Sequence, residues 1–150
     1  MSGIYKCRLQ EICNLHRFLE RGEQMIKISQ EEYEAFKEEV YQFIYAHSED
    51  DCVDCAQLHE LNRYYDPTLG TIRANREYNM TFGDFSDELY DIISELCDEE
   101  RIEPIGGTLG LAINLSAGYC LELPIAGEVK PQKELSWYPM VFRAKAFIRG

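Results

Sequence analysis

Two groups of cysteine and histidine residues could together hold a metal ion. Cys52, Cys55 and His59 follow one another at steps of three and four residues, and Cys13 and His16 are three residues apart. If both segments are helical, each group projects from one side of its helix, and the two faces packed together would offer nitrogen and sulfur ligands to a tetrahedral zinc ion. Ordinary packing is the alternative, because buried free cysteines are common between helices.

We find no sequence motif for catalysis and predict that the protein is not an enzyme. The chain lacks the Gly-x-Ser-x-Gly and His-Glu-x-x-His patterns, and the glycines of residues 106–110 are not followed by the lysine of a phosphate-binding loop. A redox role for Cys52 and Cys55 is disfavoured, since the aspartates around them oppose thiolate formation. An enzyme whose catalytic residues lie far apart in the sequence would leave no motif, so this class stays open.

Carboxylates form a row on the helix predicted over residues 84–98. Steps of three and four residues place them on one face, which Asp87 flanks. The row consists of Asp84, Glu88, Asp91, Glu95 and Asp98. The helix predicted over residues 29–47 carries a similar row, which consists of Glu31, Glu34, Glu38 and Tyr41, with Tyr45 one turn further on.

Both rows lack the basic partners that usually accompany carboxylates on an exposed helix face. Lys37 is the only lysine or arginine within the first of these two helices, and the second contains none. Three carboxylates, Asp98, Glu99 and Glu100, also cluster at the C-terminal end of the second helix, where the helix dipole disfavours negative charge. Like-charge pairs at these spacings cost about 0.2–0.5 kcal/mol each, so the rows indicate a use outside the fold.

The carboxylate rows predict a surface that binds a basic protein. Such a row, with tyrosines nearby, can present negative charge where phosphates would otherwise bind, and electrostatic attraction raises the association rate. Toxin-immunity proteins and phage anti-defence proteins are often small, acidic and single-domain, and this chain is similar to them in size and composition. We therefore expect an inhibitor that docks its acidic helices on a basic target such as a nuclease or a nucleic-acid-guided effector.

A regulatory domain that binds a small molecule or zinc is the alternative function. Its site would lie at Cys52, Cys55 and His59, or in a pocket between the helices and the sheet. No cofactor is expected under the inhibitor hypothesis, whereas zinc is expected under this one.

The negative charge is concentrated in the middle of the chain. The 150 residues carry 27 acidic and 15 basic side chains, a formal net charge of −12. Residues 31–104 hold 21 of the acidic and 5 of the basic side chains, so both ends of the chain are slightly basic. This charge disfavours direct binding to nucleic-acid phosphates and to anionic membranes, and no apolar run approaches the ~20 residues of a membrane helix.

Four helices are predicted in the first two-thirds of the chain. Apolar residues at three- and four-residue spacing indicate these helices, which cover residues 4–20, 29–47, 51–65 and 84–98. Ser29 and Glu32 form a capping box at the start of the second helix, and Asp66-Pro67 ends the third. Short strands are expected over residues 25–28 and 78–82.

The hydrophobic period changes from 3.6 to 2 in the last third of the chain. Apolar residues alternate with small or polar ones over residues 109–115 and again over 119–123, which predicts a β-hairpin around a turn. Residues 124–134 contain two prolines and a glycine and are expected to form a loop. A further strand is predicted over residues 137–148.

Together these elements predict an α+β fold in which about four helices pack on a C-terminal antiparallel sheet of three or more strands. No linker separates the halves, so we predict a single domain over residues 1–150. The N-terminal residues contain no apolar signal segment, and we therefore expect a cytoplasmic protein with reduced cysteines.

Overall fold

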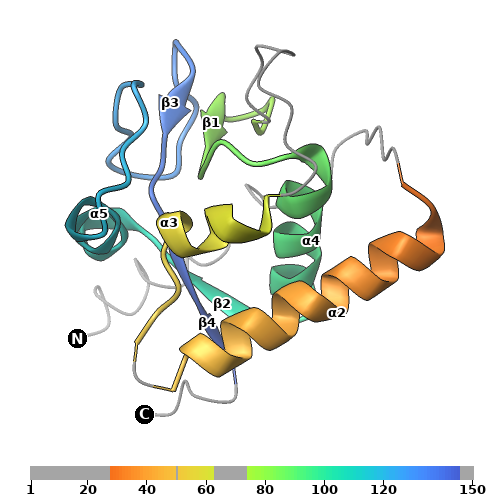
Figure 1. Cartoon of the computed structure of the whole chain (residues 1–150). Coiled ribbons are helices and arrows are strands. Elements are labelled where there is room, and N and C mark those ends of the chain that lie inside the picture. Colours follow the sequence, from red (N-terminus) through yellow and green to blue (C-terminus); the bar gives the residue numbers. More distant parts are fainter. Residues whose placement is uncertain (1–27, 50, 63–73, 146–150) are drawn as a thin grey trace, which may run out of the picture.

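The computed structural model describes residues 28–49, 51–62 and 74–145, which form a mixed α and β structure (Figure 1). The described helices are α2 (Gln30–His47), α3 (Cys55–Leu58), the 3-10 helix η1 (His59–Leu61), α4 (Asp87–Asp98) and α5 (Gly107–Ser116). The described strands are β1 (Met80–Thr81), β2 (Ile102–Ile105), β3 (Ser136–Trp137) and β4 (Val141–Ala144). The mixed α and β class is therefore confirmed. The helix predicted over residues 4–20 lies outside the described residues.

The described strands form two separate sheets of two strands each. β2 and β4 are antiparallel, with Ile102 opposite Ala144. β1 and β3 are parallel, with Met80 opposite Ser136. Within the described part of the chain, these small sheets replace the predicted antiparallel sheet of three or more strands.

The strand predicted over residues 137–148 is interrupted in the structure. β3 ends at Trp137 and β4 begins only at Val141, with Pro139 between them. Proline has no amide hydrogen to donate to a neighbouring strand, so it favours a break in the pairing. The chain consequently passes from one sheet to the other within three residues.

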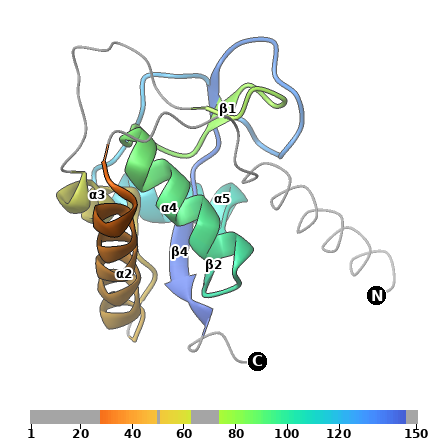
Figure 2. The ribbon, with the colours of Figure 1, turned by 90° about the vertical axis from the view of Figure 1, so that its right-hand side faces the viewer.

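α2 has the boundaries that its capping signal predicts. The Ser29 hydroxyl accepts a hydrogen bond from the Glu32 backbone N–H at 3.1 Å, which satisfies one of the first free donors of the helix. The apolar side chains of one face are buried, including Tyr33, Val40 and Ile44. This face packs against α4 and β4, and Figure 2 shows α2 and α4 side by side.

α4 is the central helix of the described structure. It begins at Asp87, because the hydroxyl of Ser86 caps it by accepting a hydrogen bond from the Leu89 N–H at 3.2 Å. Nine of its twelve residues are buried, and it packs against both α2 and β2. The hydrophobic core around it includes Phe82, Leu89 and Phe142.

The prediction of a β-hairpin over residues 109–123 is wrong, because residues 107–116 form helix α5. The buried positions of α5 are Gly110 and Asn114, which are one helical turn apart. The leucines that suggested a strand by their alternation lie around the helix, and Leu109 and Leu115 are exposed. Alternation in sequence therefore did not correspond to alternation between a core face and a solvent face.

A turn does follow residue 116, as the sequence predicts, but it ends a helix. Gly118 adopts a left-handed conformation with φ of +83°. The N–H of Tyr119 donates to the Asn114 carbonyl at 2.9 Å, and the N–H of Gly118 donates to the Leu115 carbonyl at 3.0 Å. This is the Schellman arrangement, which satisfies the last carbonyls of a helix. Residues 124–134 form the predicted loop, without helix or strand.

The third predicted helix is shorter than expected within the described residues. α3 begins at Cys55, since Asp54 and Gln57 form a capping box with N–H···O distances of 2.9 and 3.0 Å. The helix tightens into η1, which ends at Leu61. Residues 63–65 of the prediction lie outside the described residues.

Candidate functional site

The structure places much of the predicted α4 carboxylate row inside the protein. Glu88 is 3% exposed and Asp91 is 1% exposed. Asp84, Asp87 and Glu95 are partly buried, and Asp98 is exposed. The expectation of a continuous docking stripe is therefore wrong at Glu88 and Asp91, because α4 packs against other elements on several sides and not on one face alone.

Residues of α2 supply partners for the α4 carboxylates. The Tyr33 hydroxyl donates a hydrogen bond to the Glu95 carboxylate at 2.5 Å. The ammonium group of Lys37, which is buried between the helices, lies 2.5 Å from Glu99 Oε2 and 3.8 Å from Glu95 Oε2. The sequence spacing did not reveal these partners because they lie about 60 residues away, on another helix.

Arg101 connects the end of α4 to the outer face of α2. Its Nη2 donates to Glu38 Oε2 at 3.2 Å, and its guanidinium group lies 3.9 Å from the centroid of the Tyr41 ring. Hydrogen bonds from Gln42 and from Arg101 lower the pKa of Glu38. Both contacts are at the surface, so their energetic contribution is small.

The carboxylates of the predicted α2 row are exposed in the structure, and we name this surface the α2 acidic face. It consists of Glu31, Glu34, Glu38, Tyr41 and Tyr45. Its three glutamates are exposed, Tyr41 is partly buried and Tyr45 is 41% exposed. The rings of Tyr41 and Tyr45 lie 6.1 Å apart between centroids, so the face combines carboxylates with a pair of neighbouring aromatic rings.

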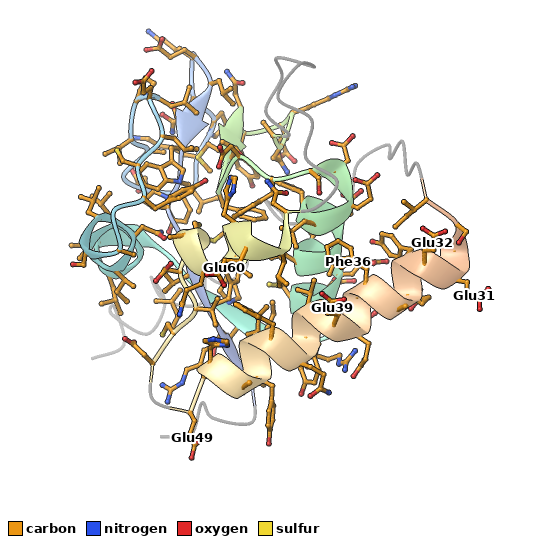
Figure 3. The ribbon with its side chains drawn as sticks, in the orientation of Figure 1. Glu31, Glu32, Phe36, Glu39, Glu49 and Glu60 are labelled. Carbon is orange, nitrogen blue, oxygen red and sulfur yellow. The ribbon has the colours of Figure 1, made fainter. Side chains whose placement is uncertain are left out.

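Further carboxylates lie on the neighbouring surface. Figure 3 labels Glu32 and Glu39 on α2, Glu49 just beyond its end and Glu60 on η1, and all four are exposed. Phe36, labelled in the same view, is buried in the core between them. The negative charge of the α2 surface therefore extends beyond the α2 acidic face.

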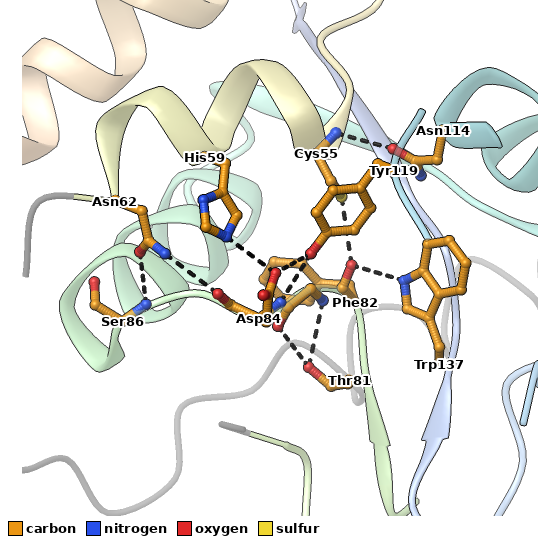
Figure 4. Close-up of polar contacts among 11 residues, drawn as sticks. Cys55, His59, Asn62, Thr81, Phe82, Asp84, Ser86, Asn114, Tyr119 and Trp137 are labelled. Carbon is orange, nitrogen blue, oxygen red and sulfur yellow. Dashed lines mark hydrogen bonds and ion pairs between the residues drawn. The ribbon is translucent and has the colours of Figure 1, made fainter. Parts of the chain in front are cut away.

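A second polar cluster centres on Asp84 (Figure 4). His59 Nε2 lies 3.1 Å from Asp84 Oδ1, and the Tyr119 hydroxyl donates to the same carboxylate oxygen. The Asp84 N–H donates back to the Tyr119 hydroxyl oxygen at 3.0 Å. Burial is the main cause that raises the pKa of Tyr119 well above its usual range. The protonated phenol therefore donates to the Asp84 carboxylate while its oxygen accepts from the Asp84 N–H.

Asn62 extends this cluster to the beginning of α4. Its Nδ2 donates to the Asp84 carbonyl at 3.2 Å, and its Oδ1 accepts from the Ser86 N–H at 2.8 Å. A carboxylate that orients an imidazole can assist proton transfer. Here, however, the same carboxylate oxygen also accepts from Tyr119, and the bonds join η1, the segment just before α4 and the segment after α5. We interpret the cluster as a structural connection.

A second hydrogen-bond network, in the core, centres on Asn114. Asn114 Oδ1 accepts from the Cys55 N–H at 2.9 Å, and Asn114 Nδ2 donates to the carbonyls of Gly110 and Met140 at 3.0 and 3.1 Å. The Cys55 thiol contacts the carbonyls of Phe82 and Met140, both at 3.4 Å. Asn114 thus uses its acceptor and both of its donors inside the protein.

In the described part of the chain, Cys52, Cys55 and His59 are not gathered around a common metal position. Among the described residues, no group of three or more His, Cys, Asp or Glu side chains is placed to hold a metal ion. The Cys55 thiol is instead buried and hydrogen-bonded to backbone carbonyls. Cys13 and His16 lie outside the described residues, so their predicted ligand role stays a prediction.

The described thiols of the Cys-x-x-Cys segment are poorly suited to redox chemistry. Burial raises the pKa of Cys52, and it raises the pKa of Cys55 more strongly. The charges of Asp51 and Asp54 act in the same direction, as expected from the sequence. Both cysteines are free in the structure.

Sequence reasoning missed the roles of Tyr119 and Asn114. Tyr119 follows Asp84 by 35 residues and Asn114 follows Cys55 by 59, so no local spacing indicates either contact. One signal was present for Asn114, which is the only strongly polar side chain within the otherwise apolar or small residues 105–115. Such a residue suggests a buried hydrogen-bonding role.

In the described residues, no helix combines the length and the apolar character needed to cross a membrane. Comparisons of the chain with protein-family models, with curated proteins and with solved structures find no match.

Proposed function

We propose that the protein is a non-enzymatic binding protein that docks the α2 acidic face on a basic surface of a target protein. The observation that supports this proposal best is the exposure of Glu34, Glu38 and Tyr45 on one side of α2 in the folded chain. Carboxylates accelerate the encounter with a basic partner, and tyrosines are enriched among the residues that contribute most to binding energy.

The acidic end of α4 supports a binding role for the same region. Asp98, Glu99 and Glu100 are exposed there, and the ion pair between Lys37 and Glu99 places this end beside α2. The helix dipole disfavours these charges, and Glu100 adopts a left-handed conformation with φ of +60°. Glu99 is used inside the fold by its ion pair with Lys37, whereas Asp98 and Glu100 add exposed negative charge where the dipole disfavours it, which suggests that these two carboxylates serve to bind a partner.

The charge pattern favours an inhibitor of the immunity or anti-defence type. A nuclease or a nucleic-acid-guided effector carries a basic cleft for phosphates, and the glutamates of the α2 acidic face would occupy the phosphate positions. Nucleic acid should then compete with the protein for its target. Tyr41 and Tyr45 would pack on apolar parts of the side chains that line the cleft.

The test combines affinity capture with a charge reversal. The tagged full chain is used to capture its partner from cells, and the dissociation constant is then measured by calorimetry for the Glu31→Lys/Glu34→Lys variant. The control, Glu122→Lys/Glu134→Lys, changes the net charge equally at two exposed positions outside α2. We expect the α2 variant to weaken binding at least about tenfold and the control to change it less than about twofold.

Two further measurements define the kind of partner. The dissociation constant should rise with salt concentration, and the partner should lose its nuclease or nucleic-acid-binding activity when the protein is bound. Equal effects of the two charge reversals would contradict a role for the α2 acidic face. Binding that single- or double-stranded nucleic acid does not displace would contradict the inhibitor mechanism.

A further inference from the structure

The outward side of α5 is an apolar surface, which we name the α5 outer face. It consists of Thr108, Leu109, Ala112, Leu115 and Ser116, all of which are exposed. Leu109 is 55% exposed and Leu115 is 48% exposed. Only four large hydrophobic side chains are exposed in the described part of the chain, and α5 contributes two of them from ten residues.

The orientation of α5 is determined by its buried side. Gly110 is packed so closely that an added Cβ would lie 2.5 Å from the Pro139 carbonyl oxygen. Asn114 is bound through its amide to the carbonyls of Gly110 and Met140 and to the Cys55 N–H. Rotation of the helix to bury its leucines would break these contacts. The exposure of Leu109 and Leu115 is thus a fixed property of the fold.

The α5 outer face belongs to the longest stretch of this sequence without a charged side chain. Residues 106–121 contain no charged side chain, although the whole chain has a net charge of −12. Figure 1 shows α5 on the opposite side of β4 from α2, which carries the α2 acidic face. Two copies of this chain repel each other through most of their surfaces, but they can approach through this uncharged helix.

The residue pattern of this face is complementary to itself. Leu109 and Leu115 lie three residues on either side of Ala112, and the small residues Thr108 and Ser116 lie four residues on either side of it. In an antiparallel pair of helices related by a two-fold axis at Ala112, each Leu109 meets the Leu115 of the other copy. The small residues at the crossing allow a close approach of the two helices.

We propose that the α5 outer face is a homodimer interface, in which two copies of the chain pair through antiparallel α5 helices. An interface made by one ten-residue helix from each copy is at the small end of the range for specific association. The dimer should therefore be weak and concentration-dependent. It would display two α2 acidic faces on one particle, which would increase the avidity for a target that offers two sites.

The test is sedimentation velocity on the full chain at concentrations from roughly 1 to 300 µM, which span weak association. The wild type should pass from monomer to dimer within this range. Ala112→Glu places a carboxylate of each copy at the crossing point and should raise the dimer dissociation constant at least about tenfold. Ile125→Glu is the control, since Ile125 is 50% exposed but lies outside α5, and it should dimerise as the wild type does.

Salt separates this association from the binding of a basic target. Raising sodium chloride from about 50 to 500 mM screens the repulsion between two copies, so the dimer should become stronger while binding to a basic partner becomes weaker. A wild type that stays monomeric over the whole range would overturn the proposal. So would dimerisation of Ala112→Glu at wild-type strength.

Circular dichroism and the thermal midpoint of Ala112→Glu should match those of the wild type, because position 112 is exposed on a helix. The conservative variant Leu109→Met keeps the apolar character of the face and should dimerise. Its failure to do so, with dimerisation retained by Leu109→Glu, would also overturn the proposal.

Discussion

At the scale of single residues, Asp84 is the point where three segments of the chain meet. Its carboxylate accepts a hydrogen bond from the Tyr119 hydroxyl and lies within hydrogen-bonding distance of the His59 imidazole. Its own N–H donates to the Tyr119 hydroxyl oxygen. Its carbonyl accepts from Asn62. Asp84 was expected to begin a binding stripe, whereas its polar groups are used within the fold.

The contribution of this cluster can be measured with Tyr119→Phe. The substitution removes one hydroxyl, so the Asp84 carboxylate loses a donor and the Asp84 N–H loses its acceptor. We expect the free energy of unfolding in urea to fall by about 1–2 kcal/mol. Tyr41→Phe, which keeps the ring under Arg101, is the control and should change stability by less than about 0.5 kcal/mol. Equal effects would argue against a structural role for the Asp84 cluster.

The thiols should differ strongly in reactivity. Burial raises the pKa of Cys55 and Cys97, so both remain protonated at pH 8, whereas Cys120 is exposed. Alkylation of the native protein with iodoacetamide at pH 8, followed by peptide mass spectrometry, should label Cys120 before the other described cysteines. Cys55 and Cys97 should react roughly a hundredfold more slowly, or slower still, until urea unfolds the chain. Labelling of Cys55 as fast as that of Cys120 would contradict the described burial.

At the scale of elements, α5 shows how one small residue positions a helix. Gly110 faces the backbone carbonyls of Pro139 and Ile105, and an added Cβ would lie 2.5 and 2.8 Å from their oxygens. Such distances are too short for any side chain, and backbone atoms cannot move aside cheaply. The close packing of α5 on the segment before β4 therefore requires glycine at this position.

Gly110→Ala should consequently destabilise the protein by about 2–3 kcal/mol, although alanine is the better helix former. The matched control is Gly127→Ala in the loop before β3, where an added Cβ has no neighbour within 4 Å. This control should change the free energy of unfolding by less than about 0.5 kcal/mol. Thermal or urea unfolding of both variants checks the prediction, and a neutral Gly110→Ala would refute the packing argument.

The C-terminal end of α4 contains a Schellman arrangement with an unfavourable residue. The N–H of Arg101 donates to the Leu96 carbonyl and the N–H of Glu100 donates to the Cys97 carbonyl, both at 3.0 Å. This geometry requires the left-handed conformation at Glu100, whose φ is +60°. A glycine would adopt it without the steric cost that a Cβ brings.

Glu100→Gly should therefore stabilise the protein by about 0.5–1 kcal/mol. Glu100→Ala removes the same carboxylate but retains the Cβ, so it separates the backbone effect from the effect of charge on the helix dipole. Denaturant unfolding should rank the glycine variant above the alanine variant. An equal gain in both variants would show that the charge, and not the backbone conformation, limits stability at this position.

At the scale of the whole molecule, Asn114 joins elements that are distant in sequence. Its side chain links α5 to the first residue of α3 and to the chain just before β4. All of its partners are backbone groups in the interior, and Asn114 itself is fully buried. Removal of this amide would leave the Cys55 N–H without its acceptor, in a place that water does not reach.

Asn114→Leu, a substitution of similar size, should lower the free energy of unfolding by about 3 kcal/mol. Its control is Gln42→Leu, in which an exposed amide on α2 is replaced, with an expected change below about 0.5 kcal/mol. Chemical unfolding at neutral pH checks both values. A cost near that of the control would mean that the three hydrogen bonds of Asn114 contribute little to the fold.

The fold also separates the surface into an acidic part and an uncharged part. α2 and the end of α4 expose most of the carboxylates discussed above, while α5 exposes leucines on the other side of β4 (Figure 1). Net charge alone does not show this division. The two proposed interactions use different parts of the surface, and they respond to salt in opposite directions.

Local signals were sufficient to predict α2 and α4. In α2, the Ser29 cap and the apolar spacing agree with each other, and the helix has the predicted C-terminus at His47. The same spacing did not show that α4 packs on several sides, since Glu88 and Asp91 look like surface residues in any helical projection. Their burial depends on the other elements that pack around α4, which no local pattern describes.

For this protein, the sequence by itself determined the two amphipathic helices and the concentration of acidic side chains in residues 31–104. It also determined that the chain carries none of the catalytic motifs considered above. Only the tertiary structure decided that residues 107–116 form a helix and which carboxylates stay exposed. The physical reason is the range of the contacts. Caps and hydrophobic spacing act within a few residues, whereas Asn114 meets partners as far as 59 residues away and Lys37 meets Glu99 across 62.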